Sequence, residues 1–411
     1  MARPRERRRR PPAAVKRARI SFRHRLARAL PLVLFAMVLS FLLDREGAFR
    51  QFESFGLDLA ANLRRARRPS AVAVVSIADS DYQALFGGRS PLDPEALVRL
   101  IDAVAQGQPK VIGVDLDTAA PGFKELVTRK GWPPVVWGRS AVFSKRRNQF
   151  RVDEVLGGTP LPPDSSGLMT LKLDEDRAVR RYQRMYETDR GFLPSLPWAV
   201  VEASWRGQAP SHRESTTELL IDFGDPGEKE RLHLAASRVL EVAGAPGWKR
   251  SSPVRGKIVL IGGDYGGRDE HDTPLGWMSG VEVIAQIVDT ELLGGGQGVA
   301  SDWVIFALQS VGGVVLLLLF HLFRAGKALL VSVGAVLALT PAFSLVAFGS
   351  VSRWAYFVPF LIAVLIADVQ SELTQKREEI LKEAVIDLAS KEKDRPEPAE
   401  GEARMRPRGH H

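Results

Sequence analysis

Residues 71–78 have the sequence AVAVVSIA, and this run decides how the central part of the chain folds. It is continuously apolar and rich in β-branched side chains, which is typical of a strand covered on both faces. Pro94 opens a predicted helix over 94–106, because proline is favoured in a first helical turn. A second buried strand, KVIGVDL, follows at 110–116. The strand–helix–strand order predicts two parallel strands in one sheet.

The pattern continues on both sides of this unit and predicts a mixed sheet with helices on its faces. Further strands are expected at 134–138, 219–223 and 254–262, and helices at 193–205 and 280–293.

Two connections are also predicted. Residues 167–173 and 178–187 alternate in polarity around a charged turn at 174–177, which favours an antiparallel hairpin. Arg180 on this segment could face an anion, although a charged hairpin surface also explains it. Asp79-Ser80-Asp81 is expected to be a loop after the first strand.

Charge is unevenly distributed along the 411 residues. Residues 1–28 hold twelve Lys or Arg and one Glu, whereas 44–302 hold 33 basic and 36 acidic residues. A basic arm can bind nucleic acid. The apolar segment that follows favours a topological signal instead, so we expect no nucleic-acid partner. The absence of Cys excludes disulfides and thiolate metal sites.

Four uncharged or nearly uncharged segments predict transmembrane helices and hence contact with the lipid bilayer. They lie at 29–43, 303–323, 328–348 and 351–369. The first is interpreted as an uncleaved anchor, because no A-x-A-like cleavage site follows it.

The positive-inside rule then orients the chain. The basic arm at 1–28 stays in the cytoplasm, residues 44–302 are exported, and the basic turn at 324–327 lies inside. Both termini are therefore expected in the cytoplasm. The tail at 370–411 is predicted to be helical at first and disordered afterwards, and its apolar stripe could pair in a homodimer.

Three stretches carry a family resemblance: VAVVSIADSD at 72–81, KVIGVDLDTAAPG at 110–122 and GKIVLIGGDYGGRDEHDTPLGWMSGVEV at 256–283. Together they resemble the second class of CHASE domains, the extracytoplasmic sensory modules of bacterial receptors. The last stretch is similar to the family signature, and its matching loop residues are Asp269, Thr273, Pro274, Gly280 and Glu282. The chain departs from the family pattern at Gly87–Leu92 and at Ser279.

The resemblance implies a membrane protein whose α/β, mixed-sheet sensor domain spans 44–302 and stands among four transmembrane helices in a bacterial inner membrane. Such sensors normally precede a cyclase or kinase domain, but only about 43 residues follow the last predicted span. Output would therefore come from a separate signalling partner. A non-sensing envelope scaffold or assembly subunit is the alternative, because the output domain is missing.

Five carboxylates follow the carboxyl ends of predicted strands: Asp79, Asp81, Asp115, Asp117 and Asp264. Ligands of parallel sheets bind at such ends, so these residues are candidates for binding an envelope ligand or a cation. The competing interpretation is that each caps the next helix or shapes a turn. An exported metal-dependent hydrolase is a third reading that rests on these acids alone.

Residues 268–272 (RDEHD) resemble a metal site in composition, but they lack helical i,i+4 spacing, and we expect Asp269 with Thr273-Pro274 to shape the loop instead. No G-x-S-x-G element accompanies the few histidines. We therefore expect no catalytic residues, no metal, no cofactor and no enzymatic activity.

Overall fold

The computed structural model describes residues 70–299 with gaps at 127–130, 147–148, 206–215, 224–230, 246 and 268. It also describes residues 38, 54, 57–58, 61–62, 353–354, 373, 376–377, 380–381 and 383–387. The chain divides into two compact units, of which residues 47–307 and 338–358 form the one that contains the sheets. All the sheets belong to this unit.

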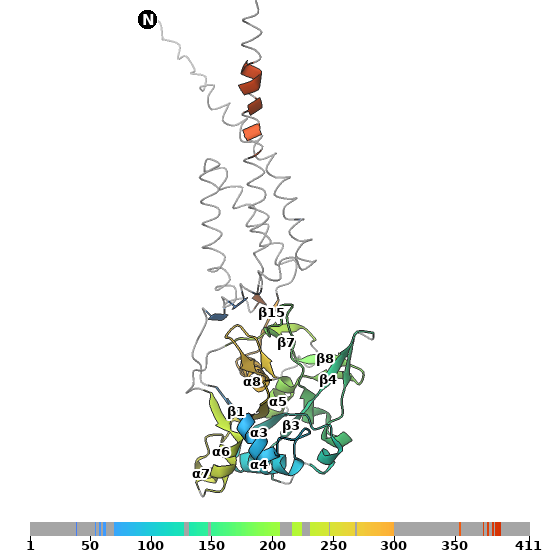
Figure 1. Ribbon diagram of the computed structural model, residues 1–411, viewed down its shortest axis with the longest axis vertical. Coiled ribbons are helices and arrows are strands. Elements are labelled where there is room, and N and C mark those ends of the chain that lie inside the picture. Colours follow the sequence, from blue (N-terminus) through green and yellow to red (C-terminus); the bar gives the residue numbers. More distant parts are fainter. Residues whose placement is uncertain are drawn as a thin grey trace, which may run out of the picture. The chain divides into compact units, whose positions relative to one another are not determined.

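A six-stranded parallel sheet forms its centre (Figure 1). In spatial order its strands are β11 (Leu232–Ala235), β1 (Val72–Ala78), β12 (Ile258–Asp264), β2 (Val111–Asp115), β3 (Val135–Arg139) and β6 (Ser166–Leu168). The prediction that β1 and β2 lie parallel in one sheet is confirmed. They are not neighbours, because β12 pairs with both of them.

Helices cover both faces of this sheet. Helices α3 (Asp79–Phe86), α4 (Pro94–Gln106) and α6 (Ala236–Ala243) pack with Ala73 and Val75 of β1 on one face. Helices α5 (Leu196–Ser204) and α8 (Gly280–Leu292) pack with Val72 and Val74 on the other. All four of these β1 side chains are fully buried. The apolar run therefore supplies two cores at once, and each buried Val contributes about 1.5–3 kcal/mol.

Two predictions about connections are wrong or only partly right. Asp79-Ser80-Asp81 is the first turn of α3 rather than a loop, and two aspartates near a helix N-terminus are stabilised by its dipole. The charged turn exists, since the Asp174 carbonyl accepts from Arg177 N at 2.9 Å. However, β6 pairs in parallel with β3, so the predicted hairpin is formed only near its turn, by the Asp174 N to Ala178 carbonyl hydrogen bond at 2.9 Å and the antiparallel bridge between Lys172 and Arg181.

Three smaller sheets surround the centre. One contains β4 (Ala141–Ser144), β5 (Gln149–Val152), β8 (Met185–Thr188) and β9 (Gly191–Pro194). A second contains β16 (Arg353–Trp354), β15 (Gln297–Val299), β10 (Glu218–Leu220) and β7 (Arg181–Gln183), and the ribbon of β13 (Glu270–His271) and β14 (Met278–Ser279) is the third.

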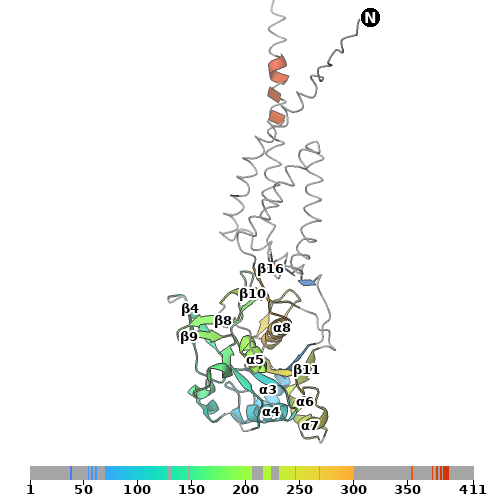
Figure 2. The same ribbon diagram turned by 180° about the vertical axis from the view of Figure 1, so that it is seen from behind.

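Both views place the β4–β9 sheet on the side away from α6 and α7 (Trp248–Ser251) (Figure 2). Because β9 precedes α5, that helix begins at Leu196 rather than at the predicted residue 193.

The predicted transmembrane segments lie almost wholly outside the described residues. Among the residues that are described, no helix is both long and apolar enough to cross a membrane. Arg353 and Trp354, expected at the start of the fourth span, form strand β16 instead and pair with Gly298 and Val299. The described residues of the predicted tail helix, between 373 and 387, are helical.

Candidate functional site

An open cleft of about 640 Å³ lies at the carboxyl ends of β2 and β12. Asp115, the last residue of β2, and Gly263 of β12 belong to its lining. The lining comes from every surrounding element: Tyr82, Ser90, Asp115, Leu116, Asp117, Met169, Leu171, Leu173, Gly263, Tyr265, Gly266, Asp269, His271, Gly280 and Ile284. This is the edge where the sequence predicts ligand binding.

The structure separates the five predicted carboxylates. Asp115 and Asp117 line the cleft, whereas Asp79, Asp81 and Asp264 do not. Buried Asp81 accepts hydrogen bonds from Ala236 N at 3.1 Å and Ser237 N at 3.3 Å, so it caps the start of α6. Asp81 therefore has the capping role of the competing interpretation, but it caps α6 and not the next helix, α3, to which it belongs.

Asp79 and Asp264 have different surroundings again. The Asp79 carboxylate accepts from Gly266 N at 2.9 Å and so holds the loop that follows β12. Asp264 ends β12 with an exposed side chain. Neither residue is placed to meet a ligand inside the cleft.

The carboxyl group of Asp115 has an unusual pKa. Burial, together with the nearby charge of Asp269, raises this pKa to about 8. A partly buried carboxyl loses some of the hydration of its charged form, which favours the protonated acid. Asp115 is therefore mostly protonated at neutral pH and can donate a hydrogen bond. Asp117, only two residues further on, is exposed and accepts from Ala119 N at 2.9 Å.

The signature loop, defined as residues 269–280, closes one side of the cleft. Its strands pair through Glu270 with Ser279 and through His271 with Met278. Gly280 N donates to the Asp269 carbonyl at 2.8 Å, and a Cβ at position 280 would overlap the Asp269 carboxylate. A larger residue at position 280 would therefore require the Asp269 side chain to move away from the start of α8. His271 Nε2 lies 3.1 Å from Asp269 Oδ1.

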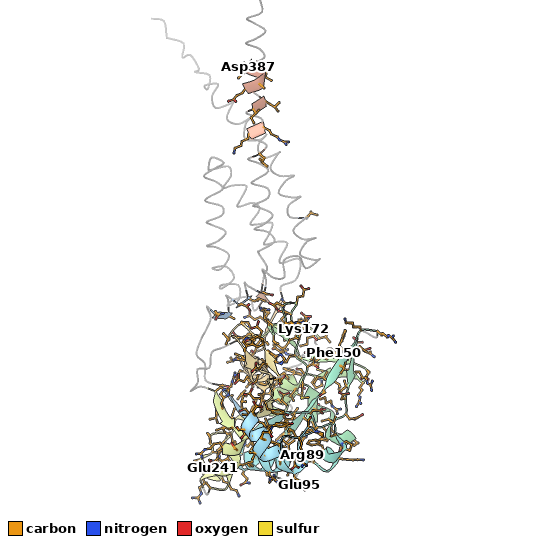
Figure 3. The ribbon with its side chains drawn as sticks, in the orientation of Figure 1. Arg89, Glu95, Phe150, Lys172, Glu241 and Asp387 are labelled. Atoms are coloured by element: carbon orange, nitrogen blue, oxygen red, sulfur yellow. The ribbon has the colours of Figure 1, made fainter. Side chains whose placement is uncertain are left out.

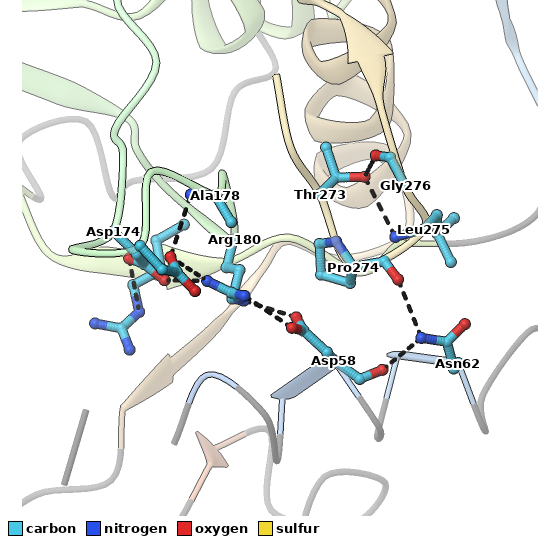
Figure 4. Close-up of polar contacts among 11 residues, drawn as sticks. Asp58, Asn62, Asp174, Ala178, Arg180, Thr273, Pro274, Leu275 and Gly276 are labelled. Carbon is cyan, nitrogen blue, oxygen red and sulfur yellow. Dashed lines mark hydrogen bonds and ion pairs between the residues drawn. The ribbon is translucent and has the colours of Figure 1, made fainter. Parts of the chain in front are cut away.

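The tip of the signature loop is a tight turn that contacts the helical segment of which residues 57–58 and 61–62 are described. The Thr273 hydroxyl donates to the Gly276 carbonyl at 2.5 Å and accepts from Leu275 N at 3.2 Å. Asn62 Nδ2 donates to the Pro274 carbonyl at 3.0 Å, as Figure 4 shows. The loop therefore connects the cleft to the chain segment that follows the first predicted span.

A buried arginine fixes the same helical segment. Arg180 donates from Nε and Nη2 to both oxygens of Asp58 at 2.7 and 2.8 Å (Figure 4). It also donates from Nη1 to Asp176 at 2.8 Å and to Asp174 at 3.3 Å. Hydrogen bonds to Asp58 and Asp176 raise the pKa of Arg180 despite its burial. Arg180 thus pairs with carboxylates of the chain itself. The interpretation that it belongs to a charged hairpin surface is wrong, because its side chain is buried.

Two walls of the cleft are apolar or aromatic. Tyr82 of α3 and Tyr265 stack with centroids 4.3 Å apart and planes inclined by 3°. Met169, Leu171 and Leu173, three alternate residues after β6, also line the cleft. The cleft thus combines a flat aromatic surface, an apolar wall and carboxyl groups, which is the usual composition of a small-molecule site.

Glu282, the last residue of the family signature, does not line the cleft. It lies in the first turn of α8, and its Oε1 is 3.5 Å from Nδ1 of His233 on β11. Partial burial lowers the pKa of His233, which Glu282 partly offsets. Glu282 therefore connects α8 to the edge of the main sheet.

Several residues of this region could not be identified from the sequence. Tyr82, Asn62 and Asp58 gave no pattern, because their partners are far away along the chain. Within the described part of the chain, no group of three or more His, Asp or Glu is arranged to hold a metal ion.

A family model described as "CHASE2 domain" matches residues 32–326. No curated protein and no solved structure matches this chain. The match includes β1, β2, the signature loop and α8, which are the elements that build the cleft.

Proposed function

The chain belongs to the CHASE2 domain family, and from this premise we propose that it is a sensor of the bacterial inner membrane whose cleft binds an envelope ligand. In the proposed topology, residues 44–302 face the periplasm and both termini lie in the cytoplasm, with four transmembrane helices between these regions. The uneven charge of the sequence supports this orientation.

One strand pairing supports the same topology. β15 and β16 pair through Gly298 with Arg353 and through Val299 with Trp354. Two predicted spans, 303–323 and 328–348, separate these strands in the sequence. An even number of crossings returns the chain to the side from which it left, so a pairing between these strands is compatible with two spans.

The observation that carries the ligand proposal is the cleft itself. About 640 Å³ is enough space for a small organic molecule, and the lining offers a stacked aromatic pair, an apolar wall and the carboxyl groups of Asp115, Asp117 and Asp269. We expect the ligand to be bound rather than converted.

The signal would leave the cleft through the signature loop. Asp269 lines the cleft, and Pro274 of the same loop accepts a hydrogen bond from Asn62. A ligand that prefers one position of the loop would thereby shift the segment following the first span, and a separate signalling partner would detect the change.

The proposal is tested by alkaline phosphatase fused after residue 200 of the full upstream chain. We expect high enzyme activity in intact cells, because this enzyme is active only outside the cytoplasm. An inactive fusion that is nevertheless produced at full length would contradict both the export of residues 44–302 and the sensor function.

The second candidate is an envelope scaffold or assembly subunit. Its supporting observation is the exposed sheet β4-β5-β8-β9, on which Val142 and Phe192 are 65% and 58% exposed. Purification of the complex from membranes distinguishes the two. A fixed stoichiometric structural partner favours the scaffold, whereas a kinase, a cyclase or another signalling enzyme favours the sensor.

A further inference from the structure

Two carboxylates face the cleft from elements that are unequally anchored. Asp115 ends β2, which pairs with β12 on one side and β3 on the other, in the middle of the six-stranded sheet. Asp269 lies in the signature loop, whose two-residue strands β13 and β14 pair only with each other. One further backbone hydrogen bond, from Val179 N to the Asp272 carbonyl at 2.8 Å, ties this loop to a neighbouring segment. A repulsion between the two acids would therefore displace the loop and leave the sheet in place.

The remaining cleft residues do little to compensate a charge on Asp115. The titratable groups that face it are Asp117 beyond β2, Tyr82 of α3, Tyr265 after β12, and Asp269 and His271 of the signature loop. The segment after β6 contributes only apolar side chains, and α8 contributes Gly280 and Ile284. None of the described residues that line the cleft is a Lys or an Arg.

The loop is in turn attached to the helical residues 57–58 and 61–62. Asn62 donates to Pro274, and Leu57 and Ala61 share a small apolar crevice with the same proline. Leu57 is only 6% exposed. A displacement of the loop tip therefore cannot occur without loosening or moving this helical segment.

We propose that the cleft is a proton-operated switch, in which ionisation of Asp115 opposes the charge of Asp269 and displaces the signature loop together with residues 57–58 and 61–62. The proposal rests on the cleft described above, but it needs no organic ligand, since the proton itself is the ligand. The protonated state holds the loop against the cleft, and the ionised state releases it.

The direction of the pH response follows from the environment of Asp115. Its pKa is raised to about 8 by burial and by Asp269, so the acid is protonated at neutral pH and ionises as the pH rises through about 8. Acidification of the surroundings would thus restore the closed loop.

The test uses the full chain in detergent micelles and exploits its lack of cysteine. Nitroxide labels are attached to Trp277→Cys, where the loop side chain is 73% exposed, and to Glu241→Cys on the exposed end of α6, which Figure 3 labels. Pulsed EPR then measures the distance between the labels from pH 6 to pH 9.5. We expect the distance distribution to shift with a midpoint near pH 8.

Four substitutions test whether ionisation of Asp115 causes the shift and whether Asn62 transmits it. Asp115→Asn, which cannot ionise, should abolish the shift, and the matched control Asp117→Asn should retain it. Asp269→Asn should move the midpoint to lower pH and reduce the shift, which keeps the test decisive if Asp115→Asn fails to fold. A second pair of labels is placed at Ser54→Cys and Glu241→Cys. In Asn62→Ala, the pH-dependent shift of the distance between this second pair should fall at least twofold, whereas the shift of the distance between labels at 277 and 241 should remain.

An unchanged distribution from pH 6 to 9.5 would overturn the switch, as would a shift that persists in Asp115→Asn or disappears in Asp117→Asn. The switch and the sensor function fail separately. If the fusion after residue 200 is active but the distance between the labels does not change with pH, the switch is refuted and the sensor function is not. If the distance between the labels changes with pH but the fusion is inactive, the switch is supported and the periplasmic location is refuted.

Discussion

Asp115 and Asp117 stand two residues apart, but packing gives their carboxyl groups different roles. Asp115 is half-buried at the end of β2, and dehydration raises its pKa to about 8. Asp117 is exposed and holds its own turn by accepting from Ala119 N. The chemical difference comes from the surroundings and not from the residue type.

Replacement of Asp115 by Asn should change how stability depends on pH. The folded-state pKa is raised above the value in an unfolded chain, so the wild type loses stability as the pH rises from about 4 to about 8. One proton accounts for at most about 1.4 kcal/mol per pH unit. Thermal unfolding of the full chain in detergent at pH 5, 6.5 and 8 should show a shallower dependence in Asp115→Asn.

The matched control for this prediction is Asp117→Asn, which should follow the wild-type dependence. Parallel stability curves for the wild type and Asp115→Asn would contradict the raised pKa.

Arg180 is the most strongly paired side chain of the described region. It is 5% exposed and binds Asp58, Asp174 and Asp176. Arg180→Ala should lower the free energy of unfolding by about 3–5 kcal/mol, because the largely buried Asp174 loses a partner. Denaturant unfolding measures the loss.

Arg190→Ala provides the comparison for Arg180. Arg190 and its partner Glu154 have side chains that are 40% and 55% exposed, so their ion pair should contribute less than about 1 kcal/mol. Equal losses in the two variants would show that burial does not govern these pairs.

At the scale of elements, helix α8 packs against β12 because of a glycine. A Cβ at position 262 would come within 2.5 Å of Val281 Cβ. Gly262→Ala should therefore push α8 from the sheet and cost about 1–3 kcal/mol, as overpacking of a core does. Thermal unfolding measures the effect.

Gly244, which follows α6, provides the matched control. A Cβ added at this position would meet nothing within 4 Å, and the residue has a φ of −71°. Gly244→Ala should be nearly neutral, and a comparable loss in both alanine variants would argue against the proposed contact between α8 and β12.

Element prediction succeeded where the pattern was local and strong. The run at 71–78 specifies a strand buried on both faces, and Pro94 specifies the start of α4. The structure adds the N-cap Asp93, whose side chain accepts from Glu95 N. The predicted hairpin at 167–187 is formed only near its turn, because alternation does not reveal the partner of each strand. Ser166–Leu168 extends the parallel sheet beside β3 instead.

At the scale of the whole molecule, the pairing of β15 with β16 constrains the proposed topology. Alkaline phosphatase fused after Gly326, in the basic turn between the second and third predicted spans, should be inactive. A fusion after Gly349 should be active, since the following residues Arg353 and Trp354 pair with β15. The reverse pattern of activities would contradict the four-span topology.

The sequence by itself determined the α/β character, the parallel arrangement of β1 and β2, and the family, because these depend on local apolar runs and on short motifs. Only the tertiary structure decided which carboxylates share the cleft. In the folded chain, Asp81 is buried and caps α6, Asp79 accepts a hydrogen bond from the loop after β12, and Asp269 lines the same cleft as Asp115. Five aspartates after strands look alike in sequence, whereas Asp79, Asp81 and Asp115 interact with residues more than a hundred positions away, and such distant neighbours fix their chemistry.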